Sequence, residues 1–351
     1  MAGRDAKMAS ERARRPLTRL LACTASLCIV LSSASVAKDQ PRTRRPCALG
    51  SADAAWLKRA LSNWQWAEAR ILRLPPSRLP EIVAVDAVCQ ANAMPKPDQP
   101  IRWRARRHNG KVSLPDGHAA PVGVMSFAAP GGADAASGFF VMSMPTVWRK
   151  AGVTSELGLE TLMEGVLLHE MTHTRQFPAV NRALQDVTRR YNLPDDINDD
   201  SIQARFGGDP AYVRGWQAET DLLYAAAAAP TDAQSRQLAG EALAAMRARR
   251  SRWYVGADEQ WRDLDDIFLQ MEGLGQWVIY KFYVDGRRRI YAPAVALQAV
   301  RRGRKQWSQE EGLGLMLVVD RLVPDWRRRV FSERPTYADA LLEAAATSSG
   351  K

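Results

Sequence analysis

Two of the four histidines in this chain lie four positions apart, in the segment His169-Glu170-Met171-Thr172-His173. On an α-helix, residues at this spacing lie one turn apart on the same face, so both imidazole rings can reach one metal ion. Imidazole is a common zinc ligand, and a catalytic zinc site combines three protein ligands with one position for water. The spacing therefore predicts a zinc site in which His169 and His173 are two of the ligands.

Glu170 follows the first histidine, which places its carboxylate beside such an ion instead of on it. Zinc lowers the pKa of a bound water to about 7, and a neighbouring carboxylate can then accept its proton. Leu162 and Val166 precede the motif at helical spacing, which indicates that the motif lies on a buried helix face. Glu170 is thus the predicted catalytic base of a hydrolytic reaction. The alternative is a structural pair of histidines.

The elements that must position this motif are strands first and helices afterwards. After a helix that begins at Ser51, strand patterns occupy residues 81–88, 101–107, 111–114, 122–127 and 138–144. Helical patterns then occupy about 156–177, 210–229, 231–253, 258–283 and a segment from 308 to about 324. This order predicts an α+β fold, with a strand-rich N-terminal lobe at 38–150 and a helical lobe at 151–351.

Two of the helix boundaries depend on local signals. Pro178 is expected to end the motif helix, because proline lacks the N–H that would continue the hydrogen-bond ladder. Ser308 and Glu311 have the spacing of a capping box, which would open the last of these helices. A capping role would account for Glu311 without any metal.

Residues 1–37 have the pattern of a secretory signal peptide. Basic residues between Arg12 and Arg19 precede the apolar run 20–31, and Ser35-Val36-Ala37 supplies small residues for cleavage. The run is shorter than the roughly 20 residues that span a bilayer. We therefore expect an exported protein, periplasmic or secreted, with no stable membrane span after signal removal. A retained signal anchor is the alternative.

Cleavage after residue 37 would leave Cys47 and Cys89 as the remaining cysteines. Two cysteines in an oxidising compartment predict one disulfide between them. Two buried free thiols are the alternative.

The formal net charge of +11 comes mainly from arginines in short runs, such as 247–252, 287–289 and 301–305. Runs of this kind are typical of solvated faces. No nucleic-acid-binding motif accompanies them, so no nucleic-acid partner is expected.

The segment Leu167-Leu168-His169-Glu170-Met171-Thr172-His173 resembles the active-site helix of the zincin metallopeptidases. The resemblance implies a strand-rich lobe before this helix and a helical lobe after it, with the helix at their junction. It also implies an edge strand beside the cleft that binds extended substrate, for which Gly138–Met144 is the expected segment. The implied activity is zinc-dependent hydrolysis of amide bonds in a peptide or protein substrate.

The resemblance further implies a third metal ligand. The metzincin pattern needs glycine at 176 and histidine at 179, where this chain has Gln176 and Ala179. The gluzincin pattern, a glutamate on a later helix, is similar to Glu272-Gly273-Leu274-Gly275. Phe268 and Leu269 lie on the same helix face, so Glu272 should point inward, and it is the preferred third ligand.

Glu219 is the alternative third ligand, because it lies between Trp216 and Leu223 on an apolar helix face. Candidate donors to an oxyanion, by residue type alone, are Tyr254, Tyr280, Tyr283 and the arginines at 287–289. A second hypothesis for function is a catalytically inactive, zincin-like envelope module that keeps the fold and acts by binding.

Overall fold

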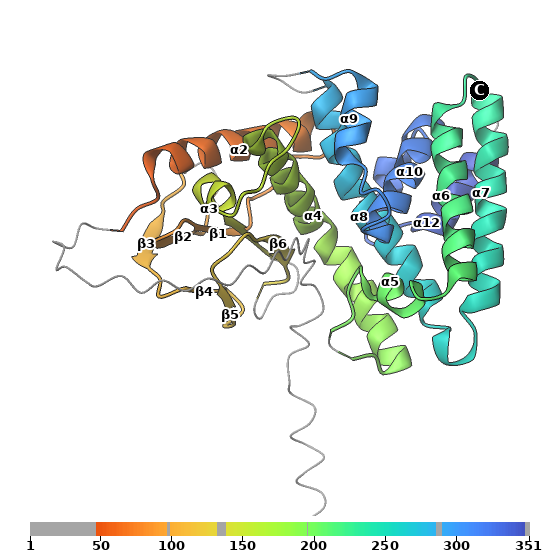
Figure 1. The fold of residues 1–351 in the computed structure, drawn as a ribbon, viewed down its shortest axis with the longest axis horizontal. Helices are drawn as coiled ribbons and strands as arrows, with labels where there is room; N and C mark the ends of the chain where they lie inside the picture. The colour runs from red at the N-terminus through yellow and green to blue at the C-terminus, as the bar shows by residue number, and fades with distance from the viewer. Residues whose placement is uncertain (1–46, 97–98, 132–137, 195, 286–289, 348–351) are drawn as a thin grey trace, which may run out of the picture.

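The computed structural model describes residues 47–96, 99–131, 138–194, 196–285 and 290–347. A strand-rich region comes first in this part of the chain and a mainly helical region follows, which confirms the predicted α+β fold (Figure 1). The helix that carries the histidine pair, α4 (Leu159–Tyr191), runs between the two regions. The predicted signal peptide, residues 1–37, lies outside the described residues.

Among the described residues, five strands form one mixed sheet in the order β3-β2-β1-β7-β6. β1 and β7 are parallel and the other neighbours are antiparallel. The strands are β1 (Glu81–Val85), β2 (Cys89–Ala93), β3 (Arg104–Arg107), β6 (Ser126–Ala129) and β7 (Phe139–Ser143). A separate hairpin joins β4 (Lys111–Ser113) to β5 (Ala119–Pro121).

The two faces of the sheet are covered by different elements. Ile82 and Ala84 of β1 belong to the large core that also contains Trp56 and Leu57 of α2 (Ser51–Arg70). Val83 and its neighbours pack on the other face against Val112 of β4. Side chains alternate along a strand, so both faces of β1 are buried, and residues 82–85 are continuously apolar.

The expected substrate-binding edge strand was assigned to the wrong segment. Gly138–Met144 contains β7, which lies inside the sheet between β1 and β6, and all five of its residues are buried. The edge strand next to α4 is β6 instead. A continuous apolar run is typical of a central strand, whereas an edge strand such as β6 is more mixed.

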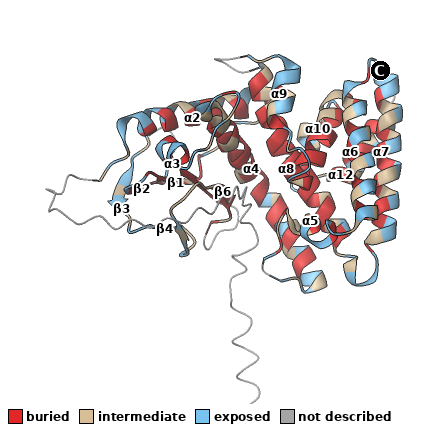
Figure 2. Ribbon diagram, viewed as in Figure 1, coloured by how far each residue is buried: buried red, intermediate tan, exposed pale blue. Residues whose placement is uncertain are grey.

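The helical region contains the remaining elements (Figure 1). After the short α3 (Pro145–Lys150) and the long α4, they are α5 (Ser201–Phe206), α6 (Pro210–Ala228), α7 (Asp232–Trp253), α8 (Trp261–Asp285), α9 (Pro293–Val300), α10 (Trp307–Leu322), α11 (Trp326–Val330) and α12 (Ala338–Thr347). In the outer helices, buried residues lie along one face (Figure 2). In α8 and α10, which lie inside the helical region, most residues are buried.

The motif helix does not end at Pro178. α4 continues through this proline to Tyr191. Beyond the proline, Val180, Leu184 and Val187 keep the apolar helical period and belong to a second core cluster. Their burial outweighs the loss of one helical hydrogen bond at the proline.

Helices α8 and α10 cross with their backbones in direct contact. A Cβ atom added to Gly273 would lie 2.2 Å from the carbonyl oxygen of Gly312, and one added to Gly312 would lie 2.4 Å from the carbonyl oxygen of Leu269. Only glycine permits this approach. The repeated Glu-Gly-Leu-Gly sequence, at residues 272–275 and 311–314, therefore marks one helix crossing.

The predicted capping box at Ser308 is wrong. α10 begins at Trp307, and the Ser308 hydroxyl has no hydrogen-bond partner among the described residues. Glu311 does not turn back to the helix start but lies 3.3 Å from Nη2 of Arg249. A buried guanidinium attracts the carboxylate more strongly than a backbone N–H does.

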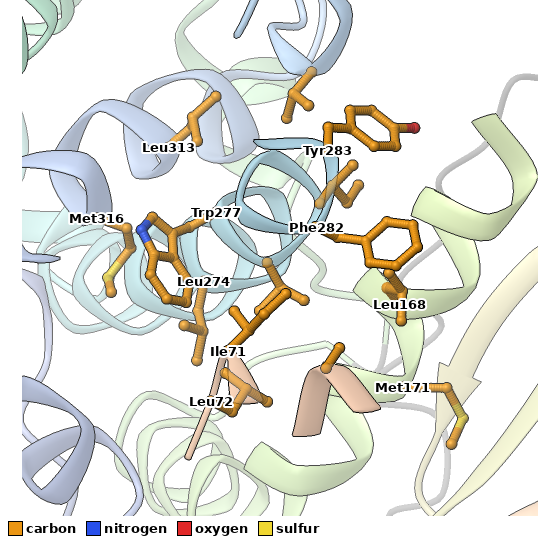
Figure 3. Close-up of a cluster of buried hydrophobic side chains, with 14 of the residues drawn as sticks. Ile71, Leu72, Leu168, Met171, Leu274, Trp277, Phe282, Tyr283, Leu313 and Met316 are labelled. Atoms are coloured by element: carbon orange, nitrogen blue, oxygen red, sulfur yellow. The ribbon is translucent and has the colours of Figure 1, made fainter. Parts of the chain in front are cut away.

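One hydrophobic core extends from Trp56 in α2 to Ala345 in α12. Figure 3 shows part of it, where Leu168 of α4 lies beside Phe282 of α8, and Trp277 of α8 lies beside Met316 of α10. Leu168 directly precedes the histidine motif, and Leu274 follows Glu272 by two positions. The core thus fixes α4 and α8 against each other, which places the motif opposite Glu272.

The predicted disulfide is confirmed, because Cys47 and Cys89 are bonded with a sequence separation of 42 residues. It ties the segment before α2 to strand β2. Within the described ranges no helix combines the length and the apolar character that crossing a bilayer requires.

Replacing both cysteines with serine is expected to lower the free energy of unfolding by about 4 kcal/mol, because the bond closes a long loop and so restricts the unfolded chain. Urea unfolding of oxidised wild type and of the double variant measures the difference. Wild-type protein treated with a reductant should unfold like the variant. Equal stability of all three samples would contradict the expectation.

Candidate metal centre

His169 and His173 of α4 converge with Glu272 of α8 in a buried cluster. The two Nε2 atoms lie 2.9 Å apart. His169 Nε2 lies 3.1 Å from Oε2 of Glu272, and His173 Nε2 lies 3.2 Å from Oε1. The residues are 4%, 0% and 0% exposed, respectively. The structure thus brings both predicted histidine ligands to the preferred third ligand, and the three residues could hold a metal ion.

The spacing of the donor atoms fits an ion of zinc's size. Bonds of 2.0–2.1 Å in tetrahedral geometry separate two ligand atoms by about 3.3 Å. The separations of 2.9, 3.1 and 3.2 Å lie close to that value. Two imidazoles and one carboxylate are also a donor set that suits a divalent transition-metal ion.

Hydrogen bonds from neighbouring residues orient two of these ligands. His173 Nδ1 lies 2.9 Å from Oε1 of Gln176, so this nitrogen donates and Nε2 keeps its lone pair for an ion. Gln309 Nε2 donates to Oε2 of Glu272 at 3.0 Å. The sequence did not predict the supporting roles of Gln176 and Gln309, because their spacing does not distinguish them from other polar residues.

Gly275 makes room for the first histidine. A Cβ atom on Gly275 would lie 2.5 Å from Nδ1 of His169, so any side chain here would displace the ring. The two glycines that follow Glu272, Gly273 and Gly275, do not share this place beside the histidine. Gly275 has this place, whereas Gly273 faces α10.

Glu170 lies beside the cluster and is almost completely buried, at 1% exposure. Its Oε2 accepts a hydrogen bond from the backbone N–H of Ala128 in β6 at 3.1 Å. Its Oε1 has no hydrogen-bond partner among the described residues. Burial raises the pKa of Glu170 to about 8, with a smaller increase from Glu272. One oxygen is therefore fixed by the sheet and the other is available to a ligand.

Without metal, the pKa values of the three residues are shifted in different directions. Burial and the neighbouring His173 lower the pKa of His169 to about 4. Burial alone would lower the pKa of His173, but Glu272 beside it raises that pKa to about 9. Burial would raise the pKa of Glu272, but His173 and the histidine hydrogen bonds hold it well below its usual range. One proton on His173 thus balances Glu272, and a metal cation can take its place.

Glu219, the alternative third ligand, lies in another buried cluster. Its carboxylate receives two hydrogen bonds from Arg249, at 2.7 and 3.1 Å. Asp265 and Glu311 also lie within 3.3 Å of Arg249. The inward face of Glu219 was predicted correctly, but its partner is an arginine instead of the histidines.

The candidate oxyanion donors are scattered. The Tyr254 hydroxyl accepts from Arg249 at 2.7 Å and so belongs to that second cluster. Tyr283 donates to the backbone oxygen of Thr161 at 3.1 Å. Tyr280 makes no hydrogen bond to the cluster within the part of the chain that the structure describes, and residues 287–289 lie outside that part.

Two charged residues near the cluster were missed from the sequence. Burial, and then the charge of Glu272, raises the pKa of Asp199 well above its usual range. Arg302 was assigned to a solvated basic run, but its guanidinium is buried, and its charge acts on His169 and Glu170. No local signal separates Arg302 from the neighbouring arginines of that run.

Comparison of the chain with protein-family models, with curated proteins and with solved structures finds no match in any of the three.

Proposed function

We propose that this chain is an exported zinc-dependent hydrolase, a metallopeptidase of the gluzincin type that cleaves amide bonds in peptide or protein substrates. The observation that carries the proposal is the convergence of His169, His173 and Glu272 on one point, with Glu170 beside them. A site with structural histidines alone has no need of a second buried carboxylate with an unpartnered oxygen.

Zinc is the metal that best suits two imidazoles and one carboxylate in a site with a position left over. When bound, it would supply Lewis-acid polarisation of the amide carbonyl and would make water a stronger acid. His169, His173 and Glu272 would hold it.

Glu170 would carry the proton transfers. Its Oε1 would accept a proton from the attacking water and then deliver it to the leaving amine. The Ala128 N–H fixes the other oxygen, so the carboxylate keeps one orientation throughout. Among the described residues, strand β6 is the edge of the sheet next to α4, and an extended peptide could pair with it.

Export is supported by the Cys47–Cys89 disulfide, since such bonds persist in oxidising compartments. The signal-peptide pattern of residues 1–37 agrees with it.

The test of the metal site is zinc content. Purified wild-type protein is expected to carry about one zinc per chain, and His169→Ala or His173→Ala should lose it, because each removes a ligand from a three-ligand site. Elemental analysis by mass spectrometry after dialysis measures the metal. His118→Ala, an exposed loop histidine, is the matched control and should keep its zinc. Full zinc content in both ligand variants would contradict the proposed metal site.

A further inference from the structure

Arg302 lies in the segment between α9 and α10, next to the metal centre. The residue is half-buried, and its side chain points inward to the amide groups of Gln309 and Gln276. Its Nε donates to Oε1 of Gln309 at 2.8 Å. The side-chain amide of Gln276 lies 3.0 Å from Nη2 of the same guanidinium.

The guanidinium of Arg302 has no acidic partner within 4.0 Å among the described residues. Glu310, which lies in the first turn of α10, binds other groups. Its Oε1 forms an ion pair with Nη2 of Arg301 at 2.6 Å. Its Oε2 accepts hydrogen bonds from the backbone N–H groups of residues 302 and 303. Glu310 thus shapes the segment and leaves the guanidinium of Arg302 to neutral amides.

A buried guanidinium without a neighbouring carboxylate is costly, because amide dipoles compensate a full charge only in part. Burial accordingly lowers the pKa of Arg302, although the more distant charges of Tyr283, Glu272, Glu310 and Glu170 raise it. A site that keeps such a charge is suited to an anionic group brought by a ligand.

Gln309 connects this guanidinium to the metal centre. Its Oε1 accepts from Arg302, and its Nε2 donates to the Oε2 of Glu272 that faces His169. One carboxamide therefore separates Arg302 from the ligand carboxylate. The charge of Arg302 also acts on His169 and Glu170, the residues of α4 that face a substrate held at the metal centre.

We propose that Arg302 binds a free carboxylate of the substrate, located next to the scissile amide. The planar guanidinium matches the two oxygens of a carboxylate. The substrate class would be peptides and acylated amino acids that lose their carboxy-terminal residue. This inference rests on the proposed hydrolase function and specifies its substrate.

The test compares two pools of N-acetylated tripeptides, identical except that one ends in a carboxylate and the other in a carboxamide. Zinc-loaded Glu170→Gln protein binds them in equilibrium dialysis without consuming them, and mass spectrometry measures retention. We expect the carboxylate pool to be retained about tenfold or more over the carboxamide pool, because a charge-assisted pair is lost in the latter. Adding Arg302→Gln should bring the ratio to about one.

Lys305→Gln in the same background is the matched control, since it makes the same charge change at an exposed position of the same segment. It should leave the ratio unchanged. Zinc content and thermal unfolding are measured for every variant, and Arg302→Lys should recover part of the ratio.

Equal retention of the two pools by zinc-loaded protein, including no retention of either, would overturn the role of Arg302. So would a ratio that survives Arg302→Gln. If Arg302→Gln instead loses zinc and weakens both pools equally, Arg302 only positions Gln309 and Glu272. Absence of zinc from wild-type protein is a different failure, which removes the proposed function itself.

Discussion

Replacing Glu272 with alanine is expected to weaken zinc binding by well over tenfold. The loss should exceed the effect of removing a supporting residue, which is about 10- to 100-fold, because Glu272 faces both histidine nitrogens at 3.1 and 3.2 Å. Competition with a chromogenic chelator gives the zinc dissociation constant. Circular dichroism and thermal unfolding check that the variant is folded.

Glu219→Ala is the matched control, because Glu219 is an equally buried glutamate of the helical region. It should keep most of its zinc, since its carboxylate binds Arg249. It should instead lower the free energy of unfolding by about 3 kcal/mol, the scale for breaking a buried ion pair. If Glu219→Ala loses zinc and Glu272→Ala keeps it, the assignment of the third ligand is wrong.

Glu170→Gln is expected to reduce the rate of hydrolysis by about 10²- to 10⁴-fold while zinc content stays near one per chain. A glutamine of the same shape can still receive the Ala128 N–H but cannot accept a proton from water. Turnover of the carboxylate-ending peptide pool, followed by mass spectrometry, measures the rate.

Glu160→Gln provides the control for that measurement. Glu160 lies on the same helix but is exposed and pairs with Arg59 at the surface, so its removal should leave the rate unchanged. A Glu170→Gln variant as active as wild type would refute the catalytic role of Glu170. Zinc-loaded wild type that hydrolyses no peptide in either pool would favour the binding module over the hydrolase.

The sequence predicted what depends on local periodicity. The paired histidines, the order of strands and helices, and the inward direction of Glu272 and Glu219 all follow from the spacing of apolar residues along one element. These features need no knowledge of which elements become neighbours.

The errors concern neighbours instead. The sequence of Gly138–Met144 does not show whether this strand lies at the edge or inside the sheet, because its pairing with β1 and β6 depends on distant segments. Pro178 was read as a helix end, although distant core contacts continue the helix. The partners of Glu311 and Arg302 come from segments far away in the chain or from amide groups without a sequence signature.

The glycine crossing of α8 and α10 has a consequence for how the centre can move. Because the two backbones touch at Gly273 and Gly312, any tilt of α8 that opened the centre would have to take α10 with it. Glu272 is on α8, Gln309 is on α10, and Arg302 is bonded to Gln309. The ligand carboxylate, the bridging amide and the guanidinium would therefore move together and keep their mutual spacing.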